Sequence, residues 1–96
     1  MIPDAIAPLV RRAILDLLDH DGGEQNDDVI TLLLAQLGHR IARRDVAEQL
    51  NWLSQQGLVD AEAVGPFIVA RTTSDGRDIA AGRLVVDGVW RHKTGS

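Results

Sequence analysis

The sequence contains no cysteine among its 96 residues. A chain without thiols has no disulfide, no thiolate metal site and no cysteine nucleophile. No apolar run approaches the roughly 20 residues that a helix needs to cross a bilayer. The first residues, MIPDAIAPLVRR, place an acid before the basic residues and lack the order of a secretory signal, in which a basic stretch precedes an apolar one. We therefore expect a soluble intracellular protein with no membrane span.

Motifs for catalysis and cofactor binding are also absent. His20, His39 and His92 are far apart and share no H-x-x-x-H spacing. The chain has no G-x-S-x-G nucleophile motif and no glycine-rich phosphate loop. The carboxylates of residues 19–28 suggest a calcium or magnesium site, but their spacing differs from that of an EF-hand loop, and a solvated loop is the favoured interpretation. We expect no enzyme activity, no cofactor, no metal and no small-molecule ligand.

Positive charge is in the minority, because ten Lys and Arg residues stand against 14 Asp and Glu residues and the formal net charge is −4. This balance argues against a simple nucleic-acid binder. The acids are concentrated in residues 1–38, which have two arginines and seven acidic residues. Residues 39–96 have eight basic and seven acidic residues, so a local basic patch there can still bind phosphate.

The length of 96 residues allows one compact domain.

Apolar spacing, capping residues and terminal glycines together predict four helices. The second is apolar almost all round, so we expect it to be covered on several sides, in part by a second copy of the chain. Asn26 or Asp27 can cap this helix, and Thr73 or Ser74 can cap the fourth. After the first helix we expect a loop to about Gln25, because two glycines and several acids follow it. The four helices are predicted at residues 8–20, 26–37, 42–56 and 73–82.

A β-hairpin is predicted at residues 58–72. Residues 58–64 alternate in polarity, residues 67–72 are rich in β-formers, and Gly65-Pro66 lies between them. Residues 83–96 are expected to form a C-terminal tail that frays from Arg91 onwards. The order of helix, helix, helix, hairpin and helix predicts a mainly α fold with a β-hairpin wing, an α+β winged helix-turn-helix, in one domain covering residues 1–96.

The third helix has two different faces. Its inner face contains Ala42, Val46, Leu50 and Leu53, and its outer face contains Arg44, Glu48, Asn51 and Gln55. Arginines near a helix N-terminus oppose the helix dipole, and an external polyanion would compensate them. We therefore expect this helix to contact DNA, with arginines on phosphate or guanine and amides on base edges. The candidate DNA-binding residues are Arg40, Arg43, Arg44, Asn51, Gln55, Arg71 and Arg77.

Each of these features has a structural alternative. Arg44 can pair with Glu48, four residues later on the same helix. The hairpin has no basic residue at its tip and can serve only to close the core with Phe67 and Val69. Trp52 can seal the third helix against the hairpin or the tail, or it can anchor an interface with a partner.

Several stretches resemble a known family. WLSQQGLVD, which joins the third helix to the hairpin, resembles the same junction in ArsR- and MarR-like winged-helix regulators, and ARTTSDGRDIA resembles the segment after their wing, with Thr72 in place of the usual leucine. The longer string GHRIARRDVAEQLNWLSQQGLVDAEAVGPFIVARTTSDGRDIAAGRLVVDGVWRH is similar to small ArsR-like proteins of Mu-like bacteriophages and prophages. The resemblance implies a DNA-binding type of fold in a phage or prophage product, located in the cytoplasm of a bacterial host. Metal sensing by ArsR members uses thiolates and is not implied here.

Two hypotheses of function follow. The first is a homodimeric winged-helix protein that binds double-stranded DNA and regulates transcription, with the first helix, the second helix or the tail at the twofold contact. The second is a winged-helix module for protein interaction, acting as a phage accessory or morphogenesis factor. The net negative charge, the acidic hairpin and Glu48 favour the second hypothesis, and the three arginines near the third helix favour the first.

Overall fold

The computed structural model describes residues 1–91, and in that range it contains four helices and a three-strand antiparallel sheet. The expected α+β class is thereby confirmed. Each helix lies within two residues of its predicted bounds. Most of the tail that was expected to fray, with His92, lies outside the described residues. The elements are α1 (Ala7–His20), β1 (Glu24–Asn26), α2 (Asp27–Gln36), α3 (Arg43–Gln55), β2 (Val59–Val64), β3 (Phe67–Thr72) and α4 (Ser74–Ala80).

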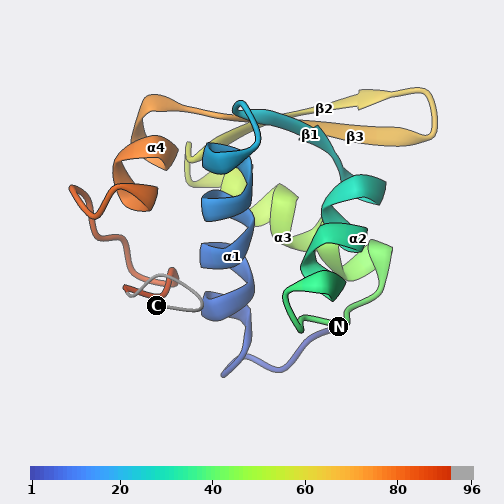
Figure 1. Ribbon diagram of the computed structural model, residues 1–96, viewed down its shortest axis with the longest axis horizontal. Coiled ribbons are helices and arrows are strands. Elements are labelled where there is room, and N and C mark those ends of the chain that lie inside the picture. Colours follow the sequence, from blue (N-terminus) through green and yellow to red (C-terminus); the bar gives the residue numbers. More distant parts are fainter. Residues whose placement is uncertain (92–96) are drawn as a thin grey trace.

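Helix α1 is the centre of the molecule. It runs beneath the sheet, with α2 on one side, α4 on the other and α3 behind it, and it contacts all three helices and β3 (Figure 1). Eight of its 14 residues are buried, among them Ile14, Leu15 and Leu18, and full burial of such side chains stabilises a fold by about 1.5–3 kcal/mol each. None of the helices within residues 1–91 has the length and apolarity that a membrane crossing requires.

The sheet contains a strand that the sequence analysis missed. Glu24 and Gln25 were expected in a loop and Asn26 at the start of the second helix, but the three residues form β1. This strand pairs antiparallel with β3, so the strand order is β1-β3-β2. The segment Glu-Gln-Asn has no apolar alternation, and its strand conformation comes from pairing with a distant segment. Gly23, the residue before β1, extends this pairing, because its carbonyl accepts a hydrogen bond of 2.8 Å from the amide of Thr72.

The hairpin contributes to the core differently from the expectation. Ala70 is fully buried and Ile68 packs against the core, whereas Phe67 and Val69, which were expected there, lie on the alternate positions of β3. Successive side chains of a strand point to opposite faces of the sheet. Val69 therefore faces away from the helices, on the outer face of the sheet.

The connection between α2 and α3 is short and well packed. Gly38 takes a φ of +93°, which a left-handed helix end requires, and the next amide, of His39, donates to the carbonyl of Leu34 at 2.8 Å. Ile41 packs against the core as expected. Ala42 does not belong to the inner face of α3, because it is the exposed N-cap residue before the first helical turn. The inner face consists of Val46, Leu50 and Leu53, with Asp45 and Gln49 buried beside them.

Two arginines of α1 attach the C-terminal segment, residues 83–91, to the body. Arg12 is 2% exposed and donates to the backbone carbonyls of Ala80, Trp90 and Arg91 and to the carboxylate of Asp16. The guanidinium of Arg11 lies 3.8 Å from the centroid of the Trp52 ring and donates to the carbonyl of Gly88 at 3.0 Å; burial lowers the pKa of Arg11. Trp52 therefore packs α3 against the tail, whereas the sequence had left open whether it would pack against the hairpin or the tail.

Candidate nucleic-acid interface

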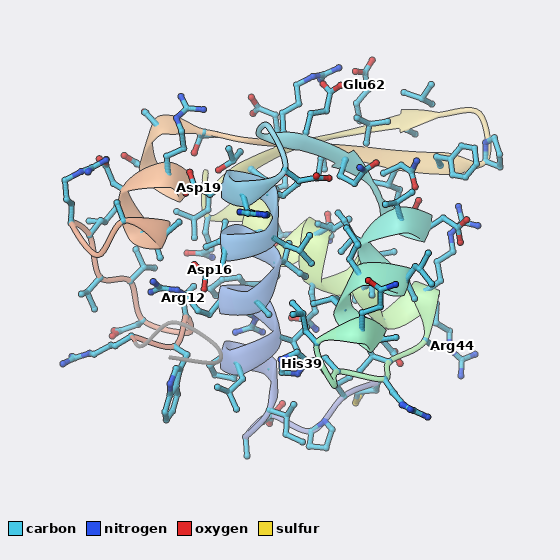
Figure 2. All side chains as sticks on the ribbon, in the orientation of Figure 1. Arg12, Asp16, Asp19, His39, Arg44 and Glu62 are labelled. Carbon is cyan, nitrogen blue, oxygen red and sulfur yellow. The ribbon has the colours of Figure 1, made fainter. Side chains whose placement is uncertain are left out.

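The outer face of α3 is exposed along its length. Arg44, Glu48, Asn51 and Gln55 are all exposed, as their helical spacing predicts, and Arg40 is exposed in the connection before the helix. Figure 2 shows Arg44 projecting outward at the edge of the molecule. Within residues 1–91, neither the Arg40 nor the Arg44 guanidinium makes a hydrogen bond or an ion pair, so Arg44 does not pair with Glu48. Two unneutralised cations and two amides are groups that bind phosphate and base edges.

Arg43 is held by the protein, unlike its two neighbours. Its Nε and one terminal nitrogen donate to the carboxylate oxygens of Asp27 at 3.1 and 3.2 Å. The same terminal nitrogen donates to the carbonyl of Pro66 at 2.8 Å, and the guanidinium lies 5.2 Å from the centroid of the Phe67 ring. Arg43 therefore joins the start of α3 to the start of α2 and to the tip of the hairpin.

Asp27 is the buried centre of this connection, which we call the Asp27 junction (Asp27, Arg43, Pro66 and Ile68). Its side chain is 4% exposed, and it also accepts a hydrogen bond of 3.1 Å from the backbone amide of Ile68. Burial alone would raise the pKa of Asp27, but the hydrogen bonds from Arg43 and Ile68 outweigh burial and hold this pKa below its ordinary value. The hydrogen bond to Asp27 in turn raises the pKa of Arg43. Both groups are charged at neutral pH, and their charges compensate each other.

Arg71 and Arg77 lie apart from the exposed arginines near α3. Arg71 forms ion pairs with Glu24 and, at 3.4 Å, with Glu62, and the hydrogen bond to Glu24 is the main reason that its pKa is raised. Arg77 is exposed on α4 and makes a 3.4 Å hydrogen bond to the carbonyl of Thr72. Helix α4 and the start of α3 are at opposite sides of the view in Figure 1. Of the candidate residues, Arg44, Asn51 and Gln55 share the outer face of α3, and Arg40 is exposed in the connection just before this helix.

The outer face of the sheet is acidic. Strand pairing places Glu24 and Asp60 on either side of Arg71 in one row across the sheet, and Glu62 opposite Val69 in the next row on the same face. Three carboxylates therefore share this face with one arginine. The acids of the hairpin were expected on a strand, whereas Glu24 was assigned to a solvated loop, because nothing in its local pattern indicates a strand. Within residues 1–91, no group of three or more His, Asp or Glu side chains is arranged so that it could hold a metal ion.

Comparison with known proteins identifies a phage relative. The chain is 37% identical over 91 residues to the uncharacterized protein gp26 of Escherichia phage Mu, and the match covers 95% of each chain. No protein-family model and no solved structure matches the chain. The expected relationship to proteins of Mu-like phages is confirmed by this match, which includes nearly all of both sequences. The chain therefore belongs to the protein family that includes gp26 of Escherichia phage Mu.

Proposed function

We propose that this Mu-related protein is an ArsR-like winged-helix protein that binds double-stranded DNA and regulates phage or prophage transcription in the bacterial cytoplasm. In this proposal α2 and α3 are the helix-turn-helix and the β2–β3 hairpin is the wing. The main supporting observation is the surface formed by Arg40, Arg44, Asn51 and Gln55, which is exposed and has two guanidinium groups without a partner in residues 1–91. We call it the α3 surface.

The α3 surface suits the DNA major groove. A helix of this diameter fits the groove, and its N-terminal residues then lie closest to the base edges and the flanking phosphates. Arg44 would bind phosphate or guanine, Arg40 would bind phosphate, and Asn51 and Gln55 would contact base edges. Arg43 would contribute less to DNA binding, because its Nε and one terminal nitrogen donate to Asp27 and Pro66 and its charge is compensated by Asp27. It would hold the start of α3 against the hairpin.

Because the outer face of the sheet is acidic, we expect the protein to contact only a short length of DNA. Glu62 and Asp60 would repel phosphate, so the hairpin would stay off the DNA backbone. We therefore expect few phosphate contacts and a moderate dependence of affinity on salt. Each neutralised phosphate contributes about 0.9 to the slope of log affinity against log salt.

The test is binding of fluorescent duplexes by the whole chain, measured as anisotropy at several salt concentrations. One duplex is the DNA upstream of the gene and the other has a scrambled sequence. We expect Arg40→Ala with Arg44→Ala to weaken binding at least about tenfold. The slope of log affinity against log salt should fall by about 1.8, because two phosphate contacts are lost. The double variant Arg83→Ala with Arg91→Ala removes the same charge elsewhere and should bind like the wild type. Unchanged affinity and slope in the first variant, or no binding at micromolar protein in low salt, contradicts the proposal.

The protein-interaction hypothesis also has a supporting observation. The outer face of the sheet contains the carboxylates of Glu24, Asp60 and Glu62. Carboxylates at these positions do not help a protein to bind DNA. A phage accessory or morphogenesis factor that binds basic proteins would use such a face. Absence of any duplex binding under low salt would favour this second function.

We further propose that the protein acts as a homodimer through α2. The sequence left α1, α2 and the tail as candidates, and α1 is mostly buried within one chain. Leu32 of α2 is 61% exposed and Leu37, the C-cap residue of α2, is 58% exposed. A groove of about 290 Å³ separates the end of α2 from the second half of α1. Large apolar side chains so exposed near the end of one helix favour burial against another molecule. Two copies related by a twofold axis would present two α3 surfaces to successive turns of DNA.

A further inference from the structure

We propose that the free edge of β2 binds an extended, basic polypeptide segment, which adds a fourth strand to the sheet. The strand order β1-β3-β2 leaves β2 at the edge, and no other strand of residues 1–91 pairs with its second side. Five of its six residues, 60 to 64, are exposed. An edge of this length presents a row of unpaired backbone N–H and C=O groups, to which an added strand can bind.

The inner side of this edge has room for the side chains of an added strand. Ala61 and Ala63 lie opposite Ala70 and Ile68 in the sheet, so they point toward the helices. Together with Ala47 and Asn51 of α3 and with Glu62 and Ile68, they line a groove of about 200 Å³. Alternate side chains of a strand added to β2 would point into this groove, and small apolar ones would fit between the alanines.

The outer side of the same edge selects basic residues. Asp60 and Glu62 point to the outer face, and Figure 2 shows Glu62 directed away from the helices. Arg71 is the basic side chain on this face, and it already forms ion pairs with both Glu24 and Glu62. Lys or Arg at the outward positions of an added strand would lie beside Asp60, which has no ion-pair partner within residues 1–91, and beside Glu62, which shares Arg71 with Glu24. Cross-strand neighbours on one face are in contact. We therefore expect a partner segment that alternates small apolar and basic residues.

The same charges disfavour a second copy of this chain at the edge. Antiparallel pairing of β2 with β2 of another molecule would place Asp60 and Glu62 of both copies on one face, where like charges repel. The edge is thus protected against self-association and open to a strand of opposite charge. Asn51 lines the groove and also belongs to the α3 surface, so a bound strand would compete with DNA wherever DNA binding holds. The strand site itself does not depend on DNA binding.

The test is an NMR titration of the whole ¹⁵N-labelled chain with a short, capped peptide of alternating Lys and Val. A peptide of alternating Glu and Val is the charge control. We expect the Lys–Val peptide to shift the amides of residues 59–64 and of Ala47 and Asn51, and to slow exchange of the β2 amides with solvent. Asp60→Asn with Glu62→Gln, which keeps the side-chain shapes, should weaken binding about tenfold, as loss of two charge pairs does.

A matched variant tests whether the peptide responds to the acids of β2 or only to the net charge of the protein. Asp19→Asn with Asp87→Asn removes two exposed acids outside β2 and should bind the Lys–Val peptide like the wild type. Any of four results overturns the proposal: no binding at millimolar peptide, equal binding of the Glu–Val peptide, binding without shifts in β2, or equal weakening in both variants. A DNA duplex that shifts the β2 amides while the Lys–Val peptide does not would also overturn it.

Discussion

Single side chains decide which of the clustered arginines are paired within the protein. Arg40, Arg43 and Arg44 are neighbours in the sequence, and the sequence analysis treated them as one basic group. In the folded chain Arg43 is directed to Asp27, 16 residues earlier, while Arg40 and Arg44 remain exposed. A partner at this separation belongs to a different helix, so the spacing of residues within α3 contains no information about it.

The Asp27 junction should make stability depend on acid. Because the pKa of Asp27 is lower in the folded chain than in the unfolded one, its stabilisation is complete well above about pH 4 and is lost as pH falls through the folded pKa. Asp27→Asn should therefore lower the free energy of unfolding by about 1–3 kcal/mol at pH 7, where a buried charged group loses its hydrogen bonds. This difference should shrink as pH falls towards about 3.

Urea unfolding followed by circular dichroism at several pH values measures this effect. Asp28→Asn is the control, because Asp28 is the exposed neighbour in the same helical turn, and a surface change of this kind usually stays within about 0.5 kcal/mol. A difference between wild type and Asp27→Asn that stays constant from pH 7 to about 3 would rule out the proposed role of the carboxylate.

The contact between α4 and the start of β2 depends on one glycine. Thr73 caps α4 by accepting from the amide of Gly76 at 3.1 Å, and its hydroxyl donates to the carbonyl of Gly57 at 2.8 Å. A Cβ on Gly76 would lie 2.2 Å from the carbonyl oxygen of Leu58, which is part of the backbone and cannot rotate away. The sequence predicted a cap at Thr73 or Ser74, and Thr73 is the one that caps α4. The close approach of the two segments follows from tertiary packing.

Gly76→Ala should therefore destabilise the protein, although alanine is the better helix former by about 1 kcal/mol. The overlap with Leu58 forces a backbone shift, and we expect a loss of about 1–3 kcal/mol, seen as a lower Tm in thermal unfolding. Gly82→Ala is the comparison, because a Cβ there meets no atom within 4 Å and only the left-handed φ of +81° opposes it. It should cost about 1 kcal/mol. A Gly76→Ala variant as stable as the wild type would contradict the packing described for α4.

Across the whole molecule, charge and apolar surface are segregated. The carboxylates of the sheet face away from the helices, Arg40 and Arg44 lie near the start of α3, and the exposed leucines lie on α2 and at its C-cap. The sequence analysis expected α2 to be covered on several sides, and in one chain Leu32 and Leu37 are not covered. The proposed homodimer would complete their burial.

Leu32→Ser with Leu37→Ser should convert a dimer into a monomer without unfolding it, because both side chains are already exposed in one chain. Light scattering coupled to size exclusion, at micromolar and higher concentrations, measures the mass directly. Val64→Ser with Val85→Ser changes two similarly exposed apolar residues elsewhere and should leave the mass unchanged. A wild-type chain that is monomeric at all concentrations would refute the dimer.

The helices and the hairpin follow from local patterns. Apolar spacing, capping residues and terminal glycines place the four helices within two residues of their bounds. Helical spacing also places Arg44, Asn51 and Gln55 opposite Val46, Leu50 and Leu53. These features were predictable because a helix or a hairpin depends on residues that are close in the chain.

The remaining features join residues far apart in the sequence. Strand β1 exists through pairing with β3, Arg43 is neutralised by Asp27, and Arg71 is neutralised by Glu24 and Glu62. The edge position of β2 likewise follows from the order in which three strands meet. Local spacing specifies which way a side chain faces on its own element, whereas its partner depends on how the elements pack, and for this protein that packing selects the surfaces available for binding.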